Sequence, residues 1–95
     1  MKIEKSQFIR ELKDRDTVSS PFLVKYAATA TDKNGKAYMN VVLMDKSGEI
    51  EGRIWEDVAR YASFMVRDAF IHVEGRIQLY QGRKQIVLNR AQALR

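Results

Sequence analysis

Short runs in which apolar residues occupy every second position constrain the fold of this chain more than any other feature. In residues 37–45 the pattern falls on Met39, Val41 and Leu43, and residues 69–79 repeat it. A period of two is that of a β-strand with one buried face. The chain is therefore expected to be built mainly from strands.

Turn signals divide the chain into five such runs. The predicted strands are residues 22–31, 37–45, 49–56, 69–79 and 84–90. Asn34-Gly35 predicts a type I′ turn, because Asn and Gly both tolerate positive φ angles. Residues 45–48 predict a type I turn that ends on a left-handed glycine, and Gln81-Gly82 marks a third turn.

The alternation also assigns the two faces of the sheet. The outward face of the second and third strands should present Tyr38, Asn40, Val42, Met44, Glu51, Arg53 and Trp55. Gly52 and Gly75 fall midway along the inward rows of their strands. A missing side chain there suits a strand that bends around a small barrel.

One segment departs from the two-residue period. Within residues 57–66 the apolar positions have helical spacing, at Val58, Tyr61, Ala62 and Met65. Acidic residues precede this segment and Arg67 follows it, as the helix dipole favours. A second, short helical turn is predicted near Phe8, Ile9 and Leu12, where it would cover one end of the barrel.

Five strands with a helix between the third and fourth is the order of elements in the OB-fold. We predict an all-β, five-stranded Greek-key OB-fold barrel, with residues 1–18 as an N-terminal lead-in and residues 19–95 as the OB-fold domain. A chain of 95 residues has no room for a second core.

The chain has no apolar run of the roughly 20 residues needed to span a bilayer. Its first 16 residues are rich in charged side chains, where a signal peptide would have its apolar region, so we expect a cytoplasmic protein without membrane contact.

Several short motifs resemble a known family. In order, they are Phe22-Leu23-Val24-Lys25, Asn34-Gly35-Lys36, Tyr38, Leu43, Asp45-Lys46-Ser47-Gly48-Glu49-Ile50-Glu51, Ile54-Trp55, Val73-Glu74-Gly75-Arg76 and Tyr80-Gln81-Gly82-Arg83. This series is similar to the OB-fold domain at the N-terminus of YhaM-type exoribonucleases. It is more loosely similar to the anticodon-binding domains of class II aminoacyl-tRNA synthetases.

The resemblance implies a function in nucleic-acid binding. In YhaM-type enzymes the OB-fold domain holds single-stranded nucleic acid, and a following HD domain with His and Asp metal ligands cleaves it from the 3′ end. This sequence has one His and no His-Asp pair, so the hydrolytic activity is not carried over. Two interpretations remain: a stand-alone binding module, or the excised domain of a longer enzyme, with an attached or separate HD-type nuclease as its partner.

The distribution of charge favours a polyanionic partner. The chain carries 17 Lys and Arg against 12 Asp and Glu, a net charge of +5. The whole excess lies from Arg76 onward, where there is no acidic residue. Unopposed positive charge concentrates the field that attracts phosphates. The alternative is that these basic residues only solvate a terminal hairpin.

OB-folds bind oligonucleotides across the outward face of strands two and three, between the loops that join strands one to two and four to five. Aromatic rings there stack on bases, while Arg and Lys contact phosphates. The candidate binding residues are Lys25, Tyr38, Asn40, Arg53, Trp55, Arg76, Tyr80, Arg83 and Lys84. Arg83 and Lys84 are the clearest phosphate contacts, because no acidic residue lies near them in the sequence.

Some of these residues have a competing structural role. Trp55 could cap the barrel edge against the helix, and Tyr80 could brace its turn. Lys33 and Lys36, which flank the first turn, either close the groove from the opposite side or are only solvated. Glu51 would repel phosphate unless it pairs with Arg53 or accepts a hydrogen bond from a base amino group.

A second function class is also open. Val42 and Met44 on the same outward face could dock a protein partner or a second copy of the chain, which would make this an interaction or self-association domain. Salt distinguishes the two functions, because phosphate contacts weaken steeply with salt and apolar contacts do not.

Catalysis has little support in the sequence. His72 and Glu74 have the spacing of a same-face pair, which we interpret as solvated because a metal site needs more ligands. With one His and no Cys, nucleophilic triads are not supported. We expect no enzymatic activity, no metal and no cofactor in this chain.

Overall fold

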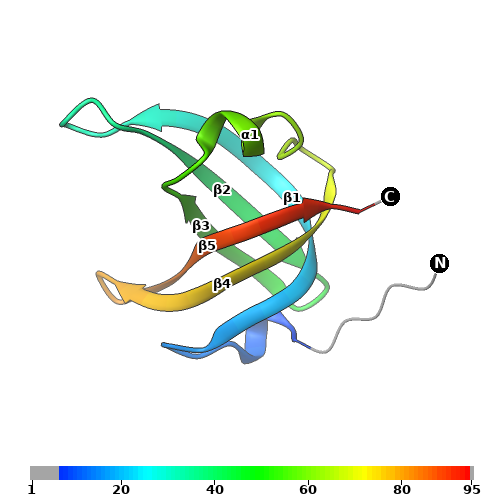
Figure 1. Ribbon diagram of the computed structural model, residues 1–95. Coiled ribbons are helices and arrows are strands. Elements are labelled where there is room, and N and C mark those ends of the chain that lie inside the picture. The colour runs from blue at the N-terminus through cyan, green and yellow to red at the C-terminus, as the bar shows by residue number, and fades with distance from the viewer. Residues whose placement is uncertain (1–6, 95) are drawn as a thin grey trace.

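The computed structural model describes residues 7–94, and within that range five strands close into a barrel in the order β1-β2-β3-β5-β4 (Figure 1). The strands are β1 (Thr17–Thr31), β2 (Ala37–Asp45), β3 (Gly48–Ile54), β4 (Phe70–Tyr80) and β5 (Arg83–Ala93). Strands β3 and β5 are parallel, and the other neighbouring pairs are antiparallel. The predicted OB-fold barrel is confirmed, with its helix between β3 and β4.

A helix lies at each end of the barrel in Figure 1. The 3-10 helix η1 (Ile9–Glu11) is the predicted N-terminal turn, and its Ile9 is buried, as is Leu12 just after it. The helix α1 (Val58–Ala62) lies at the other end. Among residues 7–94, no helix has the length and apolar character needed to cross a membrane.

Helix α1 is shorter than the predicted residues 57–66. Asp57 before it is left-handed, with φ 56°, and its side chain caps no backbone N–H. After α1 the backbone N–H groups of Phe64 and Met65 share the Tyr61 carbonyl, and the Val66 N–H donates to the Phe64 carbonyl instead of the one four residues back, so the helical ladder stops there. The apolar face is nevertheless as predicted, because Tyr61 and Met65 are buried in the core.

The ends of three strands differ from the prediction by more than one residue, and one of them is β5, which runs on to Ala93 rather than ending at residue 90. Strand β1 begins at Thr17 rather than Phe22, because its first residues pair with β4 and close the barrel. Pro21 is tolerated inside it because the pairing with β2 begins only at Leu23, so at Pro21 β1 has a single neighbour. Strand β3 ends at Ile54, which leaves Trp55 just beyond its end.

The predicted inward rows form the core of the barrel. Met39, Val41 and Leu43 of β2 are each at most 2% exposed. Gly52 faces the same interior, where an added Cβ would lie 2.9 Å from side-chain atoms of Val41 and Leu88. Gly75 of β4 has no room for a Cβ either, since it would meet the Val87 carbonyl oxygen of β5 and Ile86, so close packing requires glycine at both positions.

The three turns show two departures from the sequence pattern. Asn34 does not have positive φ, so the first turn is not type I′. Instead Asp32 Oδ1 accepts hydrogen bonds from the backbone N–H groups of Asn34 and Lys36. Gly48, with φ 159°, is close to extended and not left-handed. The type I′ turn lies at Gln81-Gly82, where both residues have positive φ.

Candidate nucleic-acid interface

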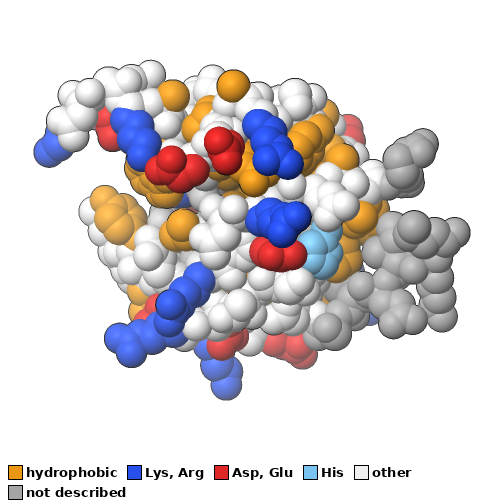
Figure 2. All heavy atoms as spheres, in the orientation of Figure 1, with side chains coloured by type: hydrophobic (Ala, Val, Ile, Leu, Met, Phe, Trp, Pro, Cys, Tyr) orange, Lys and Arg blue, Asp and Glu red, His pale blue; other side chains and the backbone are white. Residues whose placement is uncertain are grey.

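An open groove of about 430 Å³ lies between the β1–β2 and β4–β5 hairpins. Figure 2 shows the surface indented between these hairpins, at the left of the view. Six segments of the chain supply the lining, which consists of Asp32, Tyr38, Arg53, Trp55, Gln78, Tyr80 and Gln85. Four of the nine predicted binding residues therefore meet here. We call this the aromatic groove.

Three aromatic side chains of this groove come from different parts of the fold. Tyr38 and Trp55 stack on each other, with ring centroids 4.8 Å apart and planes 26° from parallel. Trp55 is 37% exposed, and Tyr80, on the other hairpin, is 55% exposed. The core contacts beneath α1 are made by Tyr61 and Met65. Trp55 therefore lines the groove and is stacked on Tyr38.

Two guanidinium groups flank one carboxylate beside the aromatic groove. Glu51 lies 3.4 Å from Arg83 Nη2 and 4.0 Å from Arg53 Nη2. Arg53 Nη1 also donates to the carbonyl of the preceding residue, Gly52, at 3.1 Å, which holds its side chain against β3. Because these ion pairs are partly exposed, solvent keeps them weak, and a phosphate can compete for the arginines.

Two other predicted cations are engaged elsewhere. Lys84 Nζ donates to the Leu12 carbonyl at 2.7 Å, so it ties the hairpin to the N-terminal segment. Lys25 Nζ pairs with Glu49 Oε2 at 2.6 Å. Neither lysine lines the aromatic groove.

Asn40 and Arg76 complete the predicted set. The Asn40 side-chain oxygen is buried and accepts no hydrogen bond within the described residues, so it is not presented to a ligand. Arg76 is exposed on β4 and lines a different groove, on the outer surface of β4 and β5.

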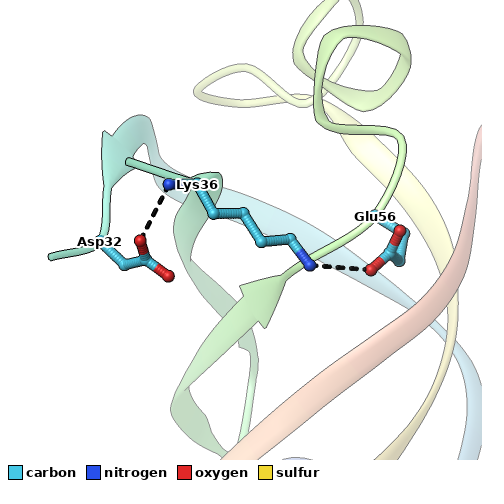
Figure 3. A network of polar contacts seen from close by, with 3 residues as sticks. All are labelled: Asp32, Lys36 and Glu56. Carbon is cyan, nitrogen blue, oxygen red and sulfur yellow. Dashed lines mark hydrogen bonds and ion pairs between the residues drawn. The ribbon is translucent and has the colours of Figure 1, made fainter. Parts of the chain in front are cut away.

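The loop between β1 and β2 is fixed by polar contacts that end at the segment after β3. The backbone N–H of Lys36 donates to Asp32 Oδ1, and Lys36 Nζ donates to Glu56 Oε2 at 3.0 Å (Figure 3). Asp32 is itself part of the groove wall. Lys36 therefore holds this wall in place, which the sequence did not indicate.

The prediction missed three polar residues of the aromatic groove: Asp32, Gln78 and Gln85. The alternation already pointed Gln78 outward, so a signal for it was present. Gln85 lies beside Glu51 through the parallel pairing of β3 with β5. No local pattern in the sequence reports that pairing.

The residues proposed for protein docking are less accessible than the alternation suggested. Val42 and Met44 are both half-buried. Large apolar side chains with high exposure lie elsewhere, at Tyr26, Trp55, Val66, Leu79 and Tyr80. His72, the other residue weighed above, has Nε2 3.0 Å from Ser19 Oγ.

Comparison with known proteins agrees with this geometry. The profile of the OB-fold nucleic acid binding domain matches residues 23–94. The chain belongs to this family. A 3'-5' exoribonuclease YhaM of Listeria monocytogenes is 39% identical over 75 residues, which cover 75% of this chain and 23% of the enzyme. The chain thus spans about a quarter of the length of the exoribonuclease it matches.

Solved structures show the same fold in more distant proteins. Asparaginyl-tRNA synthetase from Pyrococcus horikoshii superposes with a TM-score of 0.75 at 18% identity, over 99% of this chain and 23% of the synthetase. The single-stranded DNA binding protein from Thermus aquaticus gives a TM-score of 0.71 at 16% identity, over 83% of this chain and 40% of that protein.

Proposed function

We propose that this OB-fold domain binds single-stranded nucleic acid in the aromatic groove, without catalysing a reaction itself. The observation that carries the proposal is the convergence of Tyr38, Trp55 and Tyr80 with Arg53 in one open groove. Aromatic faces stack on any base, and such stacking contributes about 1–3 kcal/mol per base. Arg53 and Arg83 supply the cations that follow the phosphates.

The relatives support a role as the substrate-binding part of a nuclease. The similar Listeria protein is named as a 3'-5' exoribonuclease, and the chain matches about a quarter of it. In this proposal the domain holds the strand for an HD-type nuclease domain, attached or separate, in the cytoplasm. The polar side chains of Asp32 and Gln78 then face the edges of the stacked bases.

The test is a titration of the protein with short single strands at two salt concentrations. Because Trp55 is the one tryptophan in the sequence, quenching of its fluorescence reports occupancy of the groove directly. We expect quenching, together with an affinity whose logarithm falls linearly with log salt by about 0.7 for each phosphate contacted. A duplex of the same sequence should quench Trp55 less, because its bases are already stacked on one another.

Absence of any quenching or binding at low salt would contradict this function. Binding that does not respond to salt would instead indicate apolar docking.

A further inference from the structure

A second groove lies on the outer surface of β4 and β5, next to the aromatic groove. It has a volume of about 600 Å³ and is lined by Asp14, Arg15, Arg76, Ile77, Gln78, Leu79, Val87 and Asn89. Its two cations, Arg15 and Arg76, are exposed. We call it the outer groove.

Arg15 is held at the outer groove by the backbone. Its N–H donates to the Ile77 carbonyl at 2.8 Å, and the Ile77 N–H donates to the Asp16 carbonyl at 2.9 Å. These two bonds fasten the loop before β1 onto β4. The Arg15 side chain is 85% exposed, and its ion pair with Asp14 is long, at 4.0 Å, and exposed to solvent. This pair is therefore weak and leaves the Arg15 guanidinium able to bind an anion.

The pairing of the strands makes the two grooves continuous. Gln78 lines both of them. Arg53 of β3 pairs with Val87 of β5, which in turn pairs with Arg76 of β4. Directly paired residues share a face, so the two arginines lie in one transverse row, about 10 Å apart at the usual strand spacing. Arg53 at the aromatic groove and Arg76 at the outer groove therefore stand at the two ends of one row, with Val87 between them.

We propose that the outer groove binds the phosphate backbone of a further segment of the same strand that the aromatic groove holds. The proposal rests on the single-strand binding proposed above. Arg15 and Arg76 contact phosphates there, and the strand passes between the grooves over Gln78. The lining contains no aromatic side chain, so the outer groove adds affinity that depends on salt and length but not on base identity.

A comparison of strand lengths tests this proposal. Oligothymidylates of about 4 and about 12 nucleotides fall within the range that single OB-folds bind. The paired variant Arg15→Gln, Arg76→Gln should bind the short strand as the unaltered protein does. For the long strand, the slope of log affinity against log salt should become shallower by about 1.4, which is about 0.7 for each of the two phosphate contacts removed. Between 50 and 200 mM salt, that slope change corresponds to about a sevenfold difference.

Two further variants control for fold and for general charge. Arg15→Lys with Arg76→Lys keeps the charge and should keep most of the affinity for the long strand. Arg90→Gln removes a cation from β5 outside the groove lining and should change the slope by much less.

The outcomes separate this proposal from the function on which it rests. If the variant Arg15→Gln, Arg76→Gln weakens the binding of short and long strands equally, or weakens it no more than Arg90→Gln does, the outer groove is not part of the site. If the unaltered protein binds neither strand, single-strand binding itself fails.

Discussion

Glu51 pairs with both of the arginines proposed to contact phosphates, Arg53 and Arg83, and Glu51→Gln should therefore tighten nucleic-acid binding. Its carboxylate lies 3.4 Å from Arg83 Nη2. A phosphate bound to that guanidinium through a hydrogen bond of about 2.8 Å would lie about 6 Å from the carboxylate. At that distance two unit charges repel by about 0.7 kcal/mol in bulk water and about 3 kcal/mol at an effective dielectric constant of about 20.

Screening places the expected effect near the lower of these values. The Glu51 side chain is 38% exposed, and salt weakens the repulsion further. We expect a gain of about 1 kcal/mol, or about fivefold in Kd, for Glu51→Gln. The assay is anisotropy of a labelled oligothymidylate, whose bases offer no amino group to the carboxylate. The matched control is Glu74→Gln, which removes the same charge from β4 outside both grooves.

The same measurement with oligocytidylate distinguishes repulsion of phosphate by the Glu51 carboxylate from recognition of a base. Cytosine carries an amino donor, so weaker binding of this strand alone by Glu51→Gln would mean that Glu51 reads a base. Weaker binding of both strands would refute the reasoning, because the carboxylate would then serve to position Arg53 and Arg83 rather than to repel phosphate.

Three other substitutions test the fold. Gly75→Ala places a Cβ against the Val87 carbonyl oxygen, so it should destabilise the domain by about 2–3 kcal/mol, seen as a lower midpoint in urea; an unchanged midpoint would contradict this close packing. Lys84→Ala removes the bond to the Leu12 carbonyl and should cost about 1–2 kcal/mol of stability while changing affinity little, as denaturation and anisotropy would show; the reverse pattern would make Lys84 a phosphate contact. Gln81→Asn should stabilise the domain by about 0.5–1 kcal/mol and so raise its melting temperature, because Asn adopts the positive φ of this position more readily; a lower melting temperature would count against the type I′ geometry.

The faces of the strands could be predicted from the sequence because they depend on local alternation. Met39 and Val41 are buried where the period of two placed them, and Arg53 lies on the opposite face. The pattern failed where the backbone breaks the period. Between Val24 and Tyr26 the pairing of β1 with β2 shifts its register, and Tyr26 is 54% exposed although it has the parity of buried Val24.

The candidate site could be predicted as far as its three aromatic residues and Arg53. Tyr38, Trp55 and Tyr80 each stand at the end of a strand or at a hairpin, so the order of elements brings them together. The ionic partners could not be found in this way. Lys84 meets the Leu12 carbonyl across 72 positions of sequence, and Arg83 meets Glu51 on a neighbouring strand. Such pairs depend on barrel closure, which leaves no local pattern.

The most direct measurement of base stacking in the aromatic groove is the affinity of Trp55→Ala for a labelled single strand at two salt concentrations. We expect Kd to rise by about 5- to 150-fold, as the loss of about 1–3 kcal/mol of stacking implies, with the salt slope unchanged. The matched control is Tyr26→Ala, an exposed aromatic outside the groove lining, which should bind as the unaltered protein does. If Trp55→Ala remains folded and binds as tightly as Tyr26→Ala, bases do not stack in this groove.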